Sequence, residues 1–589
     1  MLEKKFFAAF LWVVFVIAGA GFCADLEGDW NDFLHYTKIG RFDLAKGYGQ
    51  NIIDSNPDPK EVFALSRSNV NGYRLLLKMH ESSEELREVS GKILDIINQG
   101  RYELRTDPRV ITEEIRRLSS TIRGRLAAEE RLKSAGEYAI PYMLAALADE
   151  GRSEEFANIT NALGKMGRGA IRPMVVALQT ENVAVKAEII RALGEIGYPQ
   201  SLGYLKCVAE KDSSEQLRSL AEQAIDKIDP SASKLPAAEL LFKLGEQYYN
   251  HTESLAPAEE YDFANVWFWD AEGQGLNREE VDKSYFNELM AMRSCEWALK
   301  ADENIGKAIA LWLAAFFKAE STGQSQPDYF GSAHMSAMDY ATTAGPEYLH
   351  QALERAIEEN NAYVALGVVE ALAVNAGEKS LLHRVGTEQP LVKALGFGDK
   401  KVRYSAAIAL GQAGPTSEFI GSELIIENLA AALKKEGAEE IGEELADSYS
   451  LRAIEVMLKL AVTRNEVVEV SRGLEAIIAA TQDSRSEMQI LAGEVLARIE
   501  SPDAQRAIAA MALLESNSRD IRILAFESLM ISAKQNANLL TEDQIDAIYS
   551  LVSSDATEPA VRSVAAGAYG ALNLPSRRVK DLILDQSQS

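Results

Sequence analysis

The chain has 589 residues, of which 47% are apolar and 25% charged, and its formal net charge at pH 7 is −27. This excess of acid argues against a nucleic-acid-binding role, because phosphate recognition needs a surplus of Lys and Arg on some face. A chain of this length exceeds one compact core, so it either divides into domains or grows by the stacking of repeated units.

The first 24 residues have the composition of a secretory signal peptide. Lys4 and Lys5 precede an apolar run of 17 residues (6–22), and small residues lie near its end, at 18–20; this order is typical of exported chains. We expect residues 1–24 to be removed and the mature chain to lie in the periplasm or cell envelope without a membrane span. The alternatives are an uncleaved anchor, for which such a run is marginal, and a lipid on Cys23, which Phe22 disfavours because a small residue usually precedes a lipidated cysteine.

The rest of the sequence contains no catalytic or metal-binding pattern. Cys207 and Cys295 lie far apart on apolar stretches, so we expect buried free thiols and no disulfide framework. No histidine has a second His or Cys at metal-ligand spacing. The histidines are His35, His80, His251, His334, His350 and His383. Since a nucleophile elbow, a phosphate-binding glycine loop and a calcium loop are also missing from the sequence, we expect a non-enzymatic protein with no cofactor and no metal.

Residues 25–135 are expected to form an N-terminal helical region. Gly40, Phe42, Ala45 and Pro57 resemble the second helix of a tetratricopeptide repeat, which begins with Gly and an aromatic residue and ends at Pro. Because Gly and Pro punctuate both ends of this segment, a helical hairpin is predicted. The charged stretch from 109 to about 134 predicts a helix that covers the first face of the units that follow.

A fixed period runs through residues 136–230. Ile140, Ile171 and Leu202 lie 31 residues apart in three apolar segments, each followed by a second apolar segment. Such a period is typical of stacked helix pairs. Pro141 and Pro173 in the first segments, and an apolar–basic pair that opens the second ones, resemble HEAT repeats, including those of bilin lyases. The pairs are Val185-Lys186 and Leu217-Arg218. The resemblance implies an all-α solenoid (an α–α superhelix) with tetratricopeptide-like hairpins beside it.

The same pattern returns at 346–435 and at 474–589. Val402-Arg403 opens the most HEAT-like line of the chain, and helix pairs are expected at 504–514 with 521–533 and at 545–552 with 561–572. In HEAT repeats an Asp in the turn can pair with an early Arg of the second helix to form a ladder between units. Asp399 and Arg403 fit this spacing, but Lys186 and Gln489 replace the Arg elsewhere, so the ladder is doubtful. The span 436–473 is expected to be an irregular connection, with a short extended piece at 467–470.

The segment 231–345 is expected to be helical, tetratricopeptide-like and rich in aromatic residues. One interpretation is a ligand site for sugars or peptides formed by Trp267, Trp269 and Trp297. The other is a larger helical core, in which Phe263 and Trp267 pack on the helix around 305–319, and the sequence favours this core. The acidic, glycine-containing stretch 270–275 is expected to be a turn between helices.

The sequence as a whole predicts an exported, non-catalytic scaffold that holds protein or peptide partners along a helical surface, as solenoids do. Two alternatives stay open. One is a bilin-lyase-like enzyme, which the resemblance suggests and the signal peptide opposes. The other is a receptor for glycans or small ligands that uses the aromatic middle segment. Nucleic acid is not expected as a partner.

Overall fold

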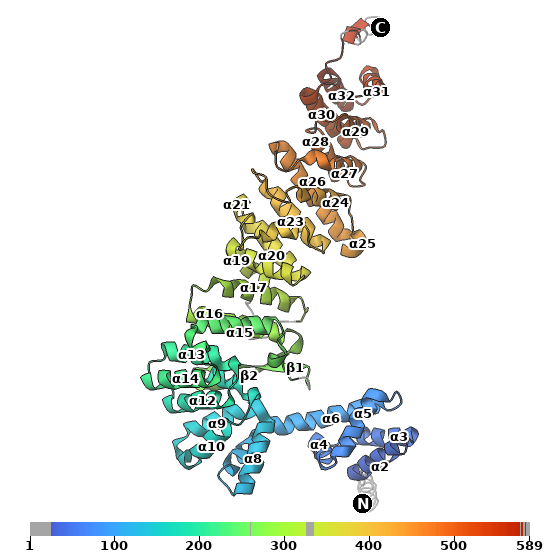
Figure 1. The fold of residues 1–589 in the computed structure, drawn as a ribbon. Helices are drawn as coiled ribbons and strands as arrows, with labels where there is room; N and C mark the ends of the chain where they lie inside the picture. The colour runs from blue at the N-terminus through green and yellow to red at the C-terminus, as the bar shows by residue number, and fades with distance from the viewer. Residues whose placement is uncertain are drawn as a thin grey trace, which may run out of the picture. The chain divides into compact units, whose positions relative to one another are not determined.

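The computed structural model describes residues 25–258, 261–324, 335–575, 577, 579–580 and 583–584. They form two compact units: unit 1 extends to Leu240 and includes Pro257–Val281, and unit 2 comprises Leu241–Ala256 and the chain from Asp282 onward. Within each unit, successive helices pair and stack, which confirms the all-α solenoid (Figure 1). No helix in the described ranges is long and apolar enough to cross a membrane. The expected signal peptide, Cys23 and His334 lie outside those ranges.

Unit 1 begins with a small helical bundle and continues into the period seen in the sequence. Its helices are α2 (Leu26–Lys38), α3 (Phe42–Asp54), α4 (Pro59–Ser68), α5 (Val70–Ser82), α6 (Arg87–Thr106), α7 (Pro108–Arg117), α8 (Ile122–Ala135), α9 (Ile140–Ala148), α10 (Phe156–Leu163), α11 (Ile171–Ala177), α12 (Val183–Ile196), α13 (Leu202–Lys211) and α14 (Glu215–Ile228). The boundary between the units falls within α15 (Ala237–Tyr249).

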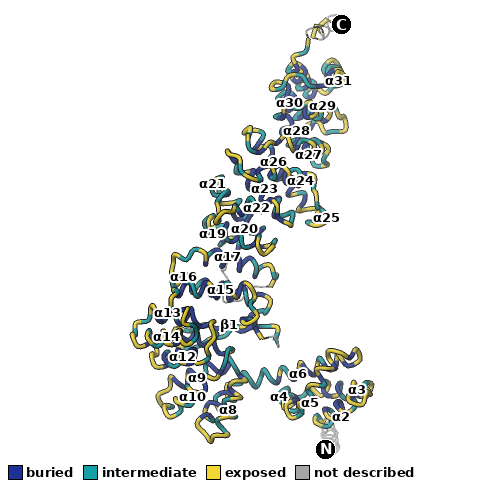
Figure 2. The backbone as a smooth tube through the Cα atoms, viewed as in Figure 1, coloured by how far each residue is buried: buried dark blue, intermediate teal, exposed yellow. Residues whose placement is uncertain are grey.

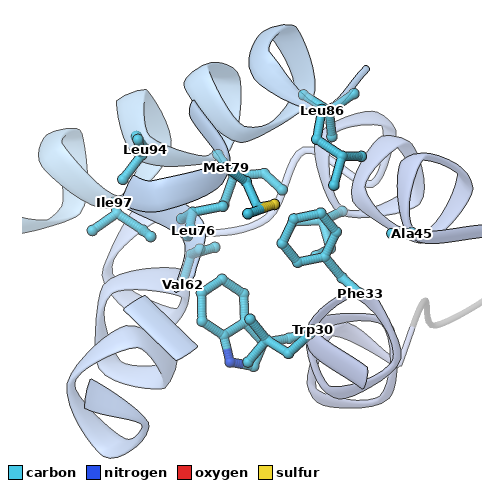
Figure 3. Close-up of a cluster of buried hydrophobic side chains, with 13 residues drawn as sticks. Trp30, Phe33, Ala45, Val62, Leu76, Met79, Leu86, Leu94 and Ile97 are labelled. Carbon is cyan, nitrogen blue, oxygen red and sulfur yellow. The ribbon is translucent and has the colours of Figure 1, made fainter. Parts of the chain in front are cut away.

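The N-terminal bundle has its own hydrophobic core. Trp30 and Phe33 of α2 pack with Val62 of α4 and Leu76 of α5, all nearly fully buried (Figure 3). The helical hairpin predicted around Gly40 is confirmed, since α2 and α3 are joined there and Gly40 has a φ of +74°. That backbone conformation favours glycine.

The 31-residue period sets the helix boundaries of the next part of unit 1. Ile140, Ile171 and Leu202 are the first residues of α9, α11 and α13. Each of these helices is preceded by a short 3₁₀ turn and followed by its partner, α10, α12 or α14. The partner helices pack in sequence, α10 on α12 and α12 on α14, and their buried stripes face inward (Figure 2). The repeat register predicted from the sequence is therefore confirmed.

The middle segment is not wholly helical. Residues 263–282 form a β-hairpin of β1 (Phe263–Asp270) and β2 (Gly275–Asp282), and β1 packs against α11. The stretch 270–275 forms a turn, as expected, but the turn joins two strands. The expectation that it joins two helices was wrong. Asp270 Oδ1 closes it by accepting hydrogen bonds from the N–H groups of Glu272 and Gly273 at 3.0 and 2.9 Å. The β-branched and aromatic residues of β1 favour a strand.

Unit 2 is a longer row of helix pairs. Its helices are α16 (Phe286–Ala301), α17 (Gly306–Glu320), α18 (Ala337–Thr343), α19 (Pro346–Glu358), α20 (Ala362–Asn375), α21 (Glu378–Leu381), α22 (Pro390–Ala394), α23 (Lys400–Ala413), α24 (Glu423–Leu433), α25 (Ala438–Ile441), α26 (Glu443–Thr463), α27 (Leu474–Ala480), α28 (Ser486–Leu496), α29 (Pro502–Leu513), α30 (Arg519–Asn536), α31 (Glu542–Ser553) and α32 (Pro559–Ala571). The pairs predicted near the C-terminus are α29 with α30 and α31 with α32.

The span 436–473 differs from the expected irregular connection. It contains α26, a helix of 21 residues that packs on α23, α24 and α28 and so continues the stack. Its buried residues, from Ala446 to Leu460, follow regular helical spacing on one face. The expected extended piece at 467–470 is not a strand, because Val467 and Val468 lie in a turn and Val470 begins a 3₁₀ helix.

The basic position that opens the second helices has a defined role. In six of these helices it is the fourth residue, and in five of them its side chain turns back to the end of the first helix of the same pair or to the turn that follows that helix. Arg218, Arg403, Gln489, Arg522 and Arg562 donate hydrogen bonds to the carbonyl oxygens of Asp212, Phe397, Asp483, Ala512 and Ser554 at 2.7–3.4 Å. Four of these carbonyl groups lie in the turn after the first helix and the fifth, that of Ala512, lies in the last turn of α29, so the bonds tie each second helix to the chain segment that precedes it.

Lys186 is the sixth of these residues, and it bridges neighbouring repeats instead. Its Nζ lies 2.9 Å from Asp212 Oδ2, in the turn before α14. One ion pair between neighbouring repeats, of the kind expected for the Asp–Arg ladder, is therefore present, with Lys in place of Arg. Asp399 does not provide another in the expected way, because its side chain caps α23 by accepting from Lys401 N.

Candidate functional site

The hairpin residue Trp267 is an anchor of unit 1. Its side chain is only 4% exposed, and the indole Nε1 donates to Glu137 Oε2 at 2.8 Å. Asn265, two positions earlier on β1, donates to Glu137 Oε1 at 2.6 Å and to the Tyr138 hydroxyl at 2.8 Å. The two side chains thus tie the hairpin to the 3₁₀ turn before α9. Phe263 and Trp267 belong to unit 1, and the helix expected to share their core, α17, belongs to unit 2.

The second strand completes this attachment. The Arg278 guanidinium lies 4.9 Å from the centre of the Tyr138 ring, and its Nη1 donates to the Tyr102 hydroxyl at 3.2 Å. The Tyr102 hydroxyl in turn donates to Glu280 Oε1 at 2.6 Å. Burial raises the pKa of Tyr138 to about 12, so its hydroxyl stays protonated at neutral pH. These polar groups have partners inside unit 1, and the cluster is structural.

The other two candidate tryptophans are half-buried and belong to different units. Trp269 lies on β1 in unit 1, and Trp297 lies on α16 in unit 2, where Lys300 Nζ is 5.3 Å from its ring centre. The structure therefore brings Trp267 and Trp269 together on one strand, whereas Trp297 belongs to the other compact unit. A ligand site shared by all three tryptophans stays a prediction.

A groove runs along the second helices of the repeats in unit 1. Its volume is about 940 Å³, and its walls come from α10, α12 and the start of α14. The apolar lining includes Phe156, Ala157, Val183 and Val185. Val183 is 51% exposed although it opens α12 in the middle of the repeats. We call this surface the repeat groove.

The charges of the repeat groove are balanced by ion pairs. Glu188 pairs with Arg191 on the same helix. Lys165 Nζ lies 3.0 Å from Glu129 Oε1, and Glu195 Oε1 lies 2.6 Å from Lys227 Nζ. Because each charged lining residue has a partner of opposite sign, the groove does not select an occupant by its net charge.

Three uncharged polar side chains of the groove have free hydrogen-bonding capacity. Thr160, Asn161 and Gln216 line it, and none of the three side chains contacts another hydrogen-bonding group within the described part of the chain. An amide side chain offers both donors and an acceptor, and a hydroxyl offers one donor and two lone pairs. The arrangement can therefore bond a polypeptide backbone laid over an apolar floor.

Other clusters of reactive side chains have structural explanations. His350 is fully buried, its Nε2 lies 2.8 Å from the Ser380 carbonyl oxygen, and burial lowers its pKa to about 4. Cys295 is buried and Cys207 half-buried, and both are free thiols; burial raises the pKa of Cys207 to about 11. The described residues include no group of three or more His, Cys, Asp or Glu residues placed to hold a metal ion.

The sequence alone did not predict the repeat groove, although apolar residues at the start of two second helices point to it. Phe156 and Val183 each open a second helix, at positions of the repeat where Ile122 and Glu215 open α8 and α14. Ile122 is itself 70% exposed. Val183 is exposed at the same position, whereas Phe156 is half-buried, and an exposed apolar residue beside a half-buried one indicates a surface available for contact.

Comparison with known proteins identifies the repeats of unit 1. The family model described as HEAT repeats matches residues 140–226, the segment of α9 to α14. Comparison with curated protein sequences gives no match. Among solved structures, Kap95p from its complex with RanGDP is 14% identical with a TM-score of 0.27, and the alignment covers 91% of this chain and 67% of that one. Importin beta is 13% identical with a TM-score of 0.24, covering 95% and 78%. Residues 140–226 of this chain are HEAT repeats.

Proposed function

We propose that the protein is a non-catalytic scaffold whose repeat groove holds an extended segment of a protein partner. The observation that carries this proposal is the combination of an apolar floor with free amide and hydroxyl groups at Thr160, Asn161 and Gln216. An extended segment presents N–H and C=O groups at regular intervals, and such groups need partners when they leave water. The groove offers them without requiring a charge on the partner.

Photo-crosslinking in the native cell tests this function. A benzoylphenylalanine placed at Ala157, which is exposed in the groove, is expected to capture a protein, and the substitution Val183→Asp is expected to abolish that product. A charge buried against the apolar floor costs several kcal/mol unless it is paired. The matched control is Val374→Asp on α20, where the valine is 74% exposed. Equal crosslinking in both variants contradicts the proposal.

We also propose that the scaffold acts outside the cytoplasm. The support is the order of Lys4 and Lys5, the apolar run 6–22 and the small residues at 18–20. Cell fractionation with mass spectrometry of the N-terminus is the test. A new N-terminus close to Asp25 in the periplasmic or envelope fraction is expected, and an intact N-terminus in the cytosol contradicts export.

A further inference from the structure

Unit 2 carries a second groove with a different chemistry. It lies between the turn that follows α23 and the turn that precedes α27, with α24 beneath, and its volume is about 540 Å³. Its apolar lining is Phe419, Ile420, Ile426 and Val467. We call this surface the acidic groove.

Hydrogen bonds hold both walls of the acidic groove in place. Asn465 Nδ2 donates to the Pro415 carbonyl oxygen at 2.9 Å and so joins one turn to the other. Asn465 Oδ1 accepts from Val467 N and Val468 N at 3.0 and 2.8 Å. Thr416 donates through its N–H and its hydroxyl to Glu378 Oε1 at 2.6 and 2.8 Å. Because the walls are tied at several points, a partner does not have to order them on binding.

Ile420 is the most exposed large apolar residue of the described chain, at 95%. A single exposed aliphatic side chain on a surface is ordinary, but this one stands at the edge of a groove whose floor is Phe419 and Ile426. Covering an exposed isoleucine side chain removes apolar surface from water and therefore favours binding. The groove therefore offers an aliphatic contact to any chain that lies in it.

The charge around these apolar residues is negative. Glu418 and Glu423 line the groove, and neither carboxylate has an ion-pair partner among the described residues. Glu469 also lines the groove, and its Oε2 lies 3.1 Å from Nε of Arg472. Arg472 is the basic residue among those that line this groove. The carboxylates of Glu418 and Glu423 therefore give the acidic groove an excess of negative charge. In the repeat groove, by contrast, each charged residue of the lining has a partner of opposite sign.

We propose that the acidic groove binds a polypeptide segment in which an aliphatic residue is flanked by Lys or Arg. The aliphatic residue covers Ile420 and Phe419, and the flanking cations meet Glu418 and Glu423. An acidic segment would bring like charges together, and a polar basic segment would leave Ile420 in water. This surface is separate from the repeat groove and does not depend on the function proposed for it.

Fluorescence anisotropy with the full chain tests the proposal. The probe is a labelled peptide of alternating lysine and leucine, compared with a glutamate–leucine peptide and a lysine–serine peptide. The lysine–leucine peptide is expected to bind tightest. Ile420→Ser is expected to weaken its binding at least about fivefold, since partial loss of the aliphatic contact is worth about 1 kcal/mol. Glu418→Gln with Glu423→Gln is expected to weaken it similarly and to reduce the salt dependence.

A matched control separates the groove from the charge of the whole chain. Leu514 is 50% exposed and is followed by the exposed Glu515 in another turn of unit 2. Leu514→Ser and Glu515→Gln repeat the same kinds of change outside the groove and are expected to alter binding less than about twofold. If they weaken binding as much as the groove variants do, or if the glutamate–leucine peptide binds equally well, the proposal is overturned. Unchanged circular dichroism of Ile420→Ser excludes misfolding as the cause.

Discussion

Glycines inside helices show how strongly one methyl group depends on its surroundings. Gly100 lies in α6, where a Cβ would come 2.0 Å from the carbonyl oxygen of Pro59 on α4. Gly47 lies in α3, and a Cβ there would meet nothing within 4 Å. In both helices alanine is intrinsically better than glycine by about 1 kcal/mol. The difference between the sites is therefore whether the neighbouring backbone leaves room.

We predict opposite signs for the two alanine substitutions. Gly100→Ala should lower the free energy of unfolding of the N-terminal bundle by about 1–3 kcal/mol, because α4 and α6 must separate. Gly47→Ala should raise it by about 0.5–1 kcal/mol. Urea titration of the full chain, followed by hydrogen exchange in α2–α6, measures both. A stabilising Gly100→Ala would show that α4 and α6 pack less closely than described.

At the scale of elements, regular spacing was predictable and irregular packing was not. The 31-residue period gave the first residues of α9, α11 and α13, because apolar residues repeated in each unit have equivalent positions. The strand β1 was not predicted because its residues 264–267 are all buried, so both faces of that part of the strand are covered. Its continuous apolar run at 266–269 does not alternate with polar residues, and such a run resembles a buried helix. The repeat groove was not predicted either. The exposure of Val183 depends on which residues pack around it in space, and the local sequence does not give that packing.

The ion pair between Lys186 and Asp212 ties two repeats together. Both side chains are largely buried, at 16% and 10% exposed. Burial raises the pKa of Asp212, but hydrogen bonds from Lys186 and from Ser214 N outweigh it and hold that pKa below its ordinary value. Because the folded pKa lies below the unfolded one, Asp212 stabilises the fold at neutral pH, and this contribution is lost as the pH falls through the folded pKa.

We predict that Lys186→Met destabilises the HEAT repeats by about 2 kcal/mol at pH 7, because it leaves the Asp212 carboxylate without its cation. The loss should shrink as the pH falls below about 4, where the aspartate of the unfolded chain is protonated. Urea unfolding at several pH values measures it. Lys227→Met is the matched control, since its pair with Glu195 is exposed at 53% and 62% and should be worth less than about 1 kcal/mol. A pH-independent loss would contradict the role assigned to Asp212.

At the scale of the whole molecule, stability should be local. In a row of stacked helix pairs each pair contacts mainly its neighbours, so unfolding free energy is close to a sum over pairs and their interfaces. The contacts of unit 2 follow this order, with α28 on α30 and α30 on α32. The HEAT repeats at 140–226 belong to unit 1. A change in one row should therefore leave distant pairs intact.

We predict that Leu529→Ala, at a fully buried position of α30, lowers local stability by about 2–5 kcal/mol, because it leaves a cavity in the core. Hydrogen exchange followed by mass spectrometry should show faster exchange in α28–α32 and unchanged exchange in α9–α14. Leu514→Ala, where the leucine is 50% exposed, is the control and should change neither region by more than about 0.5 kcal/mol. Faster exchange throughout both units would mean that the whole chain unfolds as one cooperative body, and the additive view of the solenoid would fail.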